Sequence, residues 1–404
     1  MRQLFILWCL ILMPFQNLKA DMDRMSEGDV ILGEKFSFES KILSETQHYM
    51  VILPRSYETE TSAQYNVIYV LDGHLPATMI ARTAMEANYG WGSLVPNSII
   101  IGIPSNNRIR DYSPVHSSVG FDGKNADWLT DSGGGKTYRA FLRTEFIPHI
   151  ESHYRSNGHR TLIGHSLGGL LAINDFLSKD RLFQAYVSAD PSMWFADTYL
   201  IKQLAKIPEG SLDNAGNLYI SNALKGSDTG HGATIKNNRE KKEQFLKFLG
   251  LVEAQSSGKT SIKMQHFPNE THGSVLLTSV QEGLRHAFTG YAPPDYMEVA
   301  RNPSLIVEHY RAFSKRIGGT FLPEERDVIE AARIALSEDM TDNALELHLI
   351  NVGNHPESAL AWWKLGEYHE KTENKDKALA AFSRVLTLMP DDSEVKEKVE
   401  SFSR

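Results

Sequence analysis

The chain has 404 residues, of which 41% are hydrophobic and 23% are charged; it carries a formal net charge of −8 and a single cysteine. The ordinary apolar content predicts a packed core, and the length suits one large domain with a smaller one. The acidic balance argues against a nucleic-acid partner, and a lone cysteine excludes disulfides within the chain and thiolate metal sites.

The first twenty residues have the pattern of a cleaved signal peptide. Arg2 precedes the apolar run Leu4–Phe15, and the segment ends on the small residue Ala20. The apolar run is too short for a good membrane span, so we expect no stable membrane insertion after cleavage. Because Cys9 lies inside this segment, the remaining chain has no cysteine. That composition fits export to a bacterial periplasm, with secretion as the alternative.

Residues 21–292 are predicted to form one α/β domain. Runs typical of strands alternate there with segments of helical spacing, and the first two runs are close enough to pair as a hairpin. We therefore expect a mostly parallel eight-stranded sheet with helices on both faces. The eight strand candidates are Phe36–Ile42, His48–Leu53, Tyr65–Leu71, Ser98–Ile103, Thr161–Gly164, Ala185–Ala189, Leu218–Ser221 and Ile262–Phe267.

The strongest motif is Gly-His-Ser-Leu-Gly at residues 164–168, between a strand candidate and the helical run Leu170–Leu177. In this strand–turn–helix setting, a tight turn raises the hydroxyl of Ser166 above the sheet as a nucleophile. The amide of Leu167, at the start of the helix, is expected to stabilise a developing oxyanion. The second donor is expected from the backbone amide of His74, which follows a turn at Gly73.

A serine hydroxyl needs a base, and chain order selects His272 among fifteen histidines. This residue lies in a polar loop after the last strand candidate, whereas the side chain of His165 is expected to face away. The acid that orients the base should follow the sixth or seventh strand. Asp228 is our first choice, Glu240 and Asp190 are alternatives, and a Ser–His pair without an acid stays open.

Residues 293–325 are expected to form a connector, because they contain Pro293-Pro294 and Gly318-Gly319. Residues 326–404 are predicted to be helical, with a weak repeat of 34 residues. One unit has the spacing of a tetratricopeptide repeat, at Trp362, Leu365, Gly366, Ala378, Phe382 and Pro390. Because so few units cannot bury a continuous core, we expect a helical cap on the α/β domain. A homodimerising or peptide-binding module is the alternative.

Several stretches together resemble the esterase D-like branch of the α/β-hydrolases, and most closely its periplasmic enterochelin and salmochelin esterase-like members. They are Tyr69–Gly73, Arg108–Pro114, Phe146–Ile150, Gly164–Gly169, Asp190–Trp194 and Thr271–Gly273. The resemblance implies a serine esterase in which Ser166 is the nucleophile, His272 the base, and the Leu167 and His74 amides form the oxyanion hole.

The resemblance also implies the substrate, a small carboxylic ester such as a siderophore-type lactone, cleaved through an acyl-enzyme. No cofactor and no metal are expected. An acyltransferase using the same acyl-enzyme is the alternative enzyme, and a non-catalytic binding protein on the same scaffold is the alternative of another class.

Overall fold

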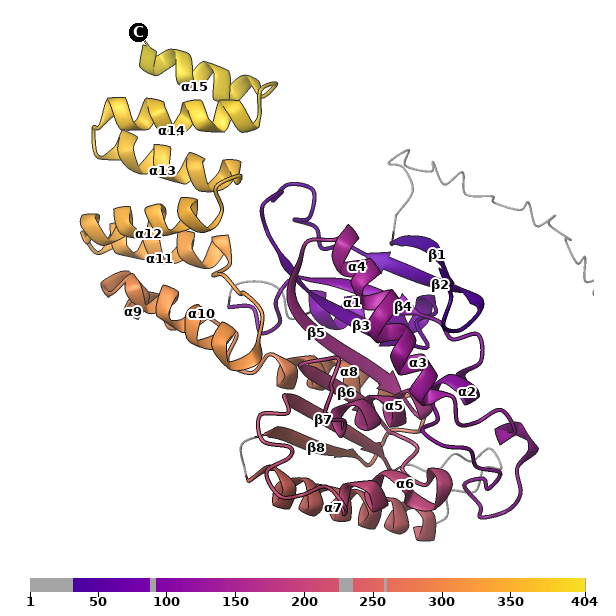
Figure 1. The fold of residues 1–404 in the computed structure, drawn as a ribbon. Helices are drawn as coiled ribbons and strands as arrows, with labels where there is room; N and C mark the ends of the chain where they lie inside the picture. The colour runs from indigo at the N-terminus through magenta and orange to yellow at the C-terminus, as the bar shows by residue number, and fades with distance from the viewer. Residues whose placement is uncertain (1–31, 88–91, 225–234, 258–259, 404) are drawn as a thin grey trace, which may run out of the picture. The chain divides into compact units, whose positions relative to one another are not determined.

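The computed structural model describes residues 32–403 except 88–91, 225–234 and 258–259. The predicted signal peptide lies outside the described residues. Within the described part of the chain, no helix is long and apolar enough to cross a membrane. The elements of residues 33–404, which form one compact unit, are shown in Figure 1.

One eight-stranded sheet forms the centre of the α/β domain, in the order β1-β2-β4-β3-β5-β6-β7-β8. β1 and β2 pair antiparallel, β2 pairs antiparallel with β4, and every later pair is parallel. The predicted fold class is therefore confirmed. The strands are β1 (Glu34–Ser40), β2 (Glu45–Ile52), β3 (Tyr65–Leu71), β4 (Ser98–Ile103), β5 (Ser156–His165), β6 (Ala185–Ala189), β7 (Asn217–Ala223) and β8 (Ser261–Phe267).

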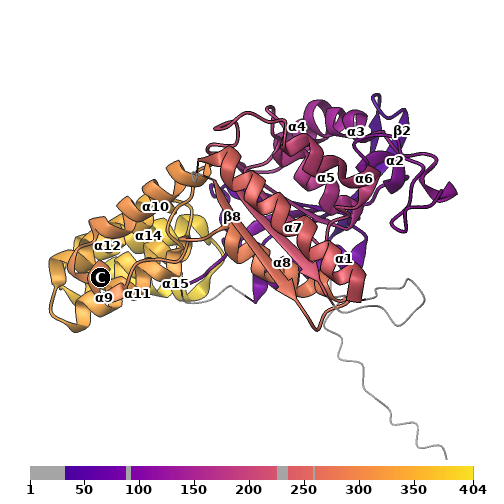
Figure 2. The ribbon, with the colours of Figure 1, turned by 90° about the horizontal axis from the view of Figure 1, so that it is seen from below.

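Helices cover both faces of the sheet, as the two views in Figures 1 and 2 show. Alternate residues of a strand point to opposite faces, and in β3 Val67 and Tyr69 join one apolar core while Ile68 and Val70 join the other. The first core also contains residues of α3 (Gly135–Phe141), η2 (Leu142–Phe146), α4 (Ile147–His153), α5 (Leu167–Phe176), α6 (Phe195–Leu204) and α7 (Ile235–Ser256). The second contains residues of α1 (Leu75–Glu86) and α8 (Val275–Ala287). Two short helices, α2 (Arg108–Tyr112) and η1 (Asp127–Leu129), lie between β4 and α3.

The segment 293–325 is not the plain connector that the sequence predicted, because it contains two helices. The second helix has four buried residues that recur at helical spacing and join the core that also contains residues of α1 and α8. They are Ile306, Tyr310, Phe313 and Ile317. The proline pair and the glycine pair thus bound this helical segment. The two helices are α9 (Tyr296–Arg301) and α10 (Ser304–Ile317).

The remaining helices are stacked one after another in Figure 1, from orange to yellow. The starts of α11 and α13 are 34 residues apart, as are the starts of α12 and α14, so the helix positions follow the period seen in the sequence. Apolar residues of α11, α12 and α13 extend the core of the α/β domain. These helices are α11 (Glu325–Ser337), α12 (Thr341–Asn354), α13 (Ala359–Lys371), α14 (Lys375–Leu388) and α15 (Ser393–Ser403).

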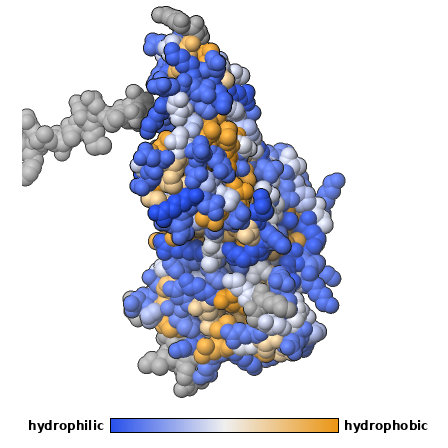
Figure 3. All heavy atoms as spheres, turned by 90° about the vertical axis from the view of Figure 1, so that its left-hand side faces the viewer, coloured by the Kyte–Doolittle hydropathy of each residue, from blue (hydrophilic) through white to orange (hydrophobic). Residues whose placement is uncertain are grey.

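The face of the molecule in Figure 3 is mainly hydrophilic, with separate hydrophobic patches. In the helical region Leu349 of α12 is 51% exposed and Leu360 of α13 is 47% exposed, and Met389, directly after α14, is 43% exposed. Single exposed apolar side chains are normal on a protein surface and do not by themselves identify a partner. A dimer or peptide partner of this region therefore stays a prediction, as does its assignment to the tetratricopeptide class.

Candidate active site

The predicted nucleophile lies on the sharp turn that joins β5 to α5. Ser166 has a φ of 58° and a ψ of −116°, a conformation that side chains other than glycine adopt only where the surroundings enforce it. The neighbouring glycines permit the turn. A Cβ atom at Gly164 would lie 2.2 Å from the carbonyl oxygen of Gly168, so any larger residue would force the turn apart. The motif therefore has the strand–turn–helix geometry expected from the sequence.

A second serine holds the hydroxyl of Ser166 in this structure. The two Oγ atoms of Ser166 and Ser192 are 3.2 Å apart, and the Ser192 amide donates to the Ser166 carbonyl at 3.1 Å. Among the hydrogen bonds of the described chain, none joins Ser166 to His272. Catalytic hydrogen bonds often tighten only when a substrate is bound, so we expect the contact between Ser166 and His272 to form in the substrate complex.

The predicted base is paired with a buried aspartate. His272 Nδ1 lies 2.6 Å from Asp190 Oδ2, and the Asp190 side chain is fully buried while that of His272 is 52% exposed. The carboxylate accepts the ring hydrogen on Nδ1, which leaves Nε2 of the neutral ring as a proton acceptor. The other carboxylate oxygen accepts from the Ala223 amide at 3.2 Å. Asp190 therefore occupies the position of an orienting acid.

The other two acid candidates are placed differently. Asp228, our first choice from the sequence, lies outside the described residues. Glu240 is an exposed side chain on α7. Asp190, the weakest sequence candidate, is the carboxylate that reaches His272. Its φ of 37° turns the chain immediately after β6, and this turn directs the side chain to the loop that carries His272.

The sequence analysis expected His165 to face away from the site. In the structure it instead contacts the loop that carries His272. Its ring packs on that of His272 with 4.5 Å between centroids, and its Nε2 lies 2.7 Å from the His272 carbonyl oxygen. A carbonyl only accepts, so Nε2 carries the hydrogen. Burial, with the neighbouring His272, lowers the pKa of His165 to about 4. The ring is therefore neutral at neutral pH and anchors the loop as a hydrogen-bond donor.

The two predicted oxyanion donors differ in their surroundings. The Leu167 amide is in the first turn of α5, where no carbonyl of the helix can accept from it. The His74 amide donates to the carbonyl of Asp72 at 2.6 Å, within its own turn. The Leu167 amide therefore lies next to Ser166 at the start of α5, and its role as a donor stays a prediction. The role of His74 also stays a prediction, and it requires the hydrogen bond to Asp72 to open.

An ion pair that the sequence analysis did not assign supports the turn before His74. Asp72, with a φ of 51°, accepts from Arg108 Nε at 2.9 Å and Nη2 at 3.1 Å. Its backbone amide donates to the hydroxyl of Tyr112 at 3.0 Å. Arg108 and Tyr112 both lie on α2, in the stretch that carried part of the family resemblance. Sequence spacing gave no means of pairing them with a turn some 36 to 40 residues earlier.

Three similarities to known proteins bear on the family of this chain. The family model described as "Putative esterase" matches residues 40–240. The chain is 25% identical over 255 residues to the ferri-bacillibactin esterase BesA of Bacillus subtilis, an alignment that covers 60% of this chain and 86% of BesA. The crystal structure of an IroE-like serine hydrolase from Shewanella oneidensis has a TM-score of 0.67 and 26% identity, and the match covers 79% of this chain and 98% of that one.

The chain is an esterase of the α/β-hydrolase fold. A solved structure also matches the helical region, which the family model does not cover. A structure from Capnocytophaga ochracea, with a TM-score of 0.56 and 16% identity, covers 92% of the esterase and 99% of its own chain. Since the α/β domain is shorter than that share, the fold of the C-terminal helices is included in the match.

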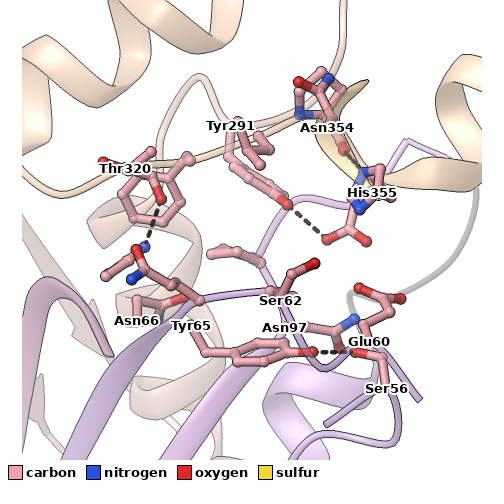
Figure 4. Close-up of a pocket in the computed structure, with 18 residues that line it drawn as sticks. Ser56, Glu60, Ser62, Tyr65, Asn66, Asn97, Tyr291, Thr320, Asn354 and His355 are labelled. Atoms are coloured by element: carbon pink, nitrogen blue, oxygen red, sulfur yellow. Dashed lines mark hydrogen bonds between the residues drawn. The ribbon is translucent and has the colours of Figure 1, made fainter. Parts of the chain in front are cut away.

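The esterase also has a cavity of about 150 Å³, drawn in Figure 4. It is formed where β3, β4 and β5 begin, whereas Ser166 follows the end of β5. Two carboxylates line it, Glu60 and Glu324, and the Tyr291 hydroxyl donates to Glu324 at 2.7 Å. Burial, with Glu324 and Glu325 nearby, raises the pKa of Glu60 to about 7. This cavity belongs to the junction with the C-terminal helices and not to the candidate active site.

In the part of the chain that the structure describes, no group of three or more histidine, cysteine, aspartate or glutamate side chains is arranged to hold a metal ion. The candidate active site of the esterase consists of hydroxyl, imidazole, carboxylate and backbone groups. These groups are sufficient for acyl transfer by nucleophilic catalysis.

Proposed function

We propose that the esterase hydrolyses a carboxylic ester of siderophore type through an acyl-enzyme on Ser166. The observation that carries the proposal is the 2.6 Å contact between buried Asp190 and His272, at the sheet edge that bears the Ser166 turn. A histidine whose Nδ1 is fixed by a carboxylate presents Nε2 as a base. The siderophore-type substrate is supported by the similarity to BesA, whose name states an action on ferri-bacillibactin.

In the proposed reaction, the Ser166 hydroxyl first leaves Ser192 and turns to His272. Ser166 Oγ attacks the ester carbonyl carbon while its proton passes to His272 Nε2, and the Leu167 amide donates to the oxyanion. The C–O bond to the alcohol then breaks, and His272 returns the proton to the departing oxygen. A water molecule, activated by the same nitrogen, adds to the acyl carbon and releases the acid and Ser166.

The roles of His272 and Asp190 follow from this sequence of proton transfers. Asp190 stabilises the imidazolium that exists between the transfers and does not itself become protonated. His165 acts through His272, because its neutral ring holds the backbone of the loop at 2.7 Å. Ser192 keeps the nucleophile in place before substrate binds.

Replacing Ser166 tests the proposal. With a cyclic trilactone siderophore and a simple alkyl ester as substrates, Ser166→Ala should reduce kcat on the order of 10³-fold or more, because the covalent step is lost. Circular dichroism would establish that the variant is folded, and chromatography of the products would measure turnover. Near-normal hydrolysis of both substrates by a folded Ser166→Ala protein would contradict the proposal. Hydrolysis of the alkyl ester alone by the unmodified esterase would retain the mechanism and refute the siderophore substrate.

A further inference from the structure

An ion pair lies at the start of the helix that follows the candidate nucleophile. The Asp72 carboxylate accepts from Arg108 Nε at 2.9 Å and from Arg108 Nη2 at 3.1 Å. A Cβ atom built on Gly168 would lie 3.5 Å from Asp72 Oδ2. Since Gly168 is the second residue of α5, the carboxylate lies against the first turn of this helix, the turn that begins with Leu167.

Two other observations place this ion pair beside the candidate active site. Burial lowers the pKa of His165, and the negative charges of Asp190 and Asp72 act against that shift. Asp72 is therefore close enough to act on the residue that precedes Ser166. In addition, α2, which carries Arg108, packs against α5.

Arg108 is presented by a short helix that is itself fixed. The side chain of Asn107 caps α2 by accepting from the Arg110 amide at 3.1 Å. Arg110 Nη2 in turn lies 2.6 Å from Glu45 Oε1 on β2. The guanidinium of Arg108 is therefore held in a defined place, and its two hydrogen bonds fix the Asp72 carboxylate.

The position of Asp72 creates a conflict of charge that Arg108 removes. The first turn of a helix attracts negative charge, because its amides have no acceptor within the helix. In the proposed reaction that charge is the oxyanion, to which the Leu167 amide donates. An unpaired carboxylate at the same helix end would repel the oxyanion and would itself accept from the amides. Arg108 offsets the charge of this carboxylate and engages both of its oxygens.

We propose that Arg108 is a positioning residue for the reaction. It neutralises Asp72 and holds this carboxylate away from the first amides of α5, so that they remain available to the oxyanion. This inference rests on the proposed function, since it concerns the transition state of the same reaction. Because Arg108 acts only through Asp72, the loss of Arg108 alone should be more damaging than the loss of both partners.

Variants of the ion pair test the proposal with ethyl butanoate, a neutral ester. Arg108→Gln should lower kcat about 10- to 100-fold, less than the removal of an oxyanion donor, and change KM by less than about threefold. Asp72→Asn and Arg108→Gln/Asp72→Asn should both stay within about fivefold of the unmodified esterase, because neither has an unpaired carboxylate at the helix end. Arg108→Lys keeps the positive charge and should also stay within about fivefold. Arg143→Gln is the matched control, since Arg143 is paired with Asp180 and its side chain is 38% exposed, as is that of Arg108; it should leave kcat unchanged.

The order of the variants distinguishes this role from a purely structural one. If the ion pair only held the turn in place, Asp72→Asn would cost as much as Arg108→Gln, and the double variant would restore nothing. Either result, in proteins with an unchanged Tm, refutes the proposal, as does an unchanged kcat in Arg108→Gln. An effect of Arg108→Gln confined to the KM of an anionic ester would assign Arg108 to substrate binding and would also refute it. If Arg108→Gln does not fold, Arg108→Met, which also removes the charge, takes its place in the same comparison.

An inhibitor that mimics the oxyanion gives a second measurement without turnover. A trifluoromethyl ketone bonds through its carbonyl carbon to Ser166 Oγ, whose proton passes to His272, and the ketone oxygen becomes an anion in the place of the oxyanion. Its Ki should rise about 10- to 100-fold in Arg108→Gln and recover in the double variant, in step with kcat. An unchanged Ki contradicts the role of Arg108 while hydrolysis through Ser166 stands. If Ser166→Ala hydrolyses ethyl butanoate as well as the unmodified esterase does, the proposed function itself fails.

Discussion

Replacing Asp190 by asparagine would change which ring nitrogen of His272 carries the hydrogen, without changing the shape of the site. Asp190 Oδ1 accepts from the Ala223 amide, which is a donor and can face only the oxygen of an asparagine. The asparagine NH2 group would then face His272 Nδ1. Since an NH2 group donates, Nδ1 would have to accept, and the ring hydrogen would move to Nε2. The histidine would then present a hydrogen to Ser166 where a base is needed.

The size of the effect follows from this change of tautomer and from the lost carboxylate charge. In a serine–histidine–aspartate site the same replacement lowers kcat by about 10⁴-fold with the geometry intact. We therefore expect a loss of about 10³- to 10⁴-fold in kcat, equivalent to about 4–5.5 kcal/mol of transition-state stabilisation. Folding stability should not fall by a comparable amount, because the side chains are isosteric.

Steady-state hydrolysis of an alkyl ester, with thermal unfolding as the check on folding, would measure this loss. Asp228→Asn and Glu240→Gln are the matched controls, since each removes a carboxylate that the sequence offered for the same role. We expect both controls to remain within about tenfold of the unmodified esterase, a far smaller loss than replacing an orienting acid causes. A folded Asp190→Asn protein with near-normal kcat would refute the reasoning, and a large loss in Asp228→Asn instead would move the acid to Asp228.

Two further predictions concern stability, each measured by thermal unfolding. A Cβ atom at Gly366 would lie 2.6 Å from the buried ring of Phe382, so Gly366→Ala should destabilise the helical region by about 1–3 kcal/mol. Gly353→Ala is the control, because nothing lies within 4 Å of its Cβ position, and it should be neutral or stabilising by up to about 1 kcal/mol; equal effects of the two replacements would contradict the packing described for α13 and α14. The pKa of Glu60 is raised from 4.5 to about 7, so between these pH values the unfolded chain ionises this group and the folded chain does not, and stability falls as pH rises. Glu60→Gln should therefore raise the Tm at pH 8, by the equivalent of on the order of 1 kcal/mol in the free energy of unfolding, and have little effect near pH 4. A variant whose Tm differs from that of the unmodified esterase equally at both pH values would argue against this titration.

Much of the fold follows from local sequence patterns. The strands of the sheet are short apolar runs, and their order along the chain, with long helical segments between them, predicts parallel pairing. The turn at Ser166 is equally local, since the glycine at 164 is required by the backbone of Gly168 and Gly169, within five residues. The helix α10 was missed because its flanking proline and glycine pairs outweighed the helical spacing of four buried residues.

The acid and the role of His165 could not be predicted in the same way. Which carboxylate meets His272 depends on the turn after β6, where the positive φ of Asp190 directs its side chain across to a loop 82 residues later. From the sequence, Asp190-Pro191 has the composition of an ordinary turn. The contact of His165 with the His272 loop likewise joins residues 107 positions apart. Such pairings are fixed by the packing of β5, β6 and the loop after β8, not by spacing along the chain.

The identity of the nucleophile can be tested most directly by covalent labelling with a fluorophosphonate. Such a probe phosphonylates an activated serine, and peptide mass spectrometry locates the adduct. We predict one adduct, on the peptide that contains Ser166, with labelling lost in Ser166→Ala and strongly slowed in Asp190→Asn. Labelling of another residue at the same rate in the Ser166→Ala protein would contradict the assignment of Ser166 as the nucleophile of this esterase.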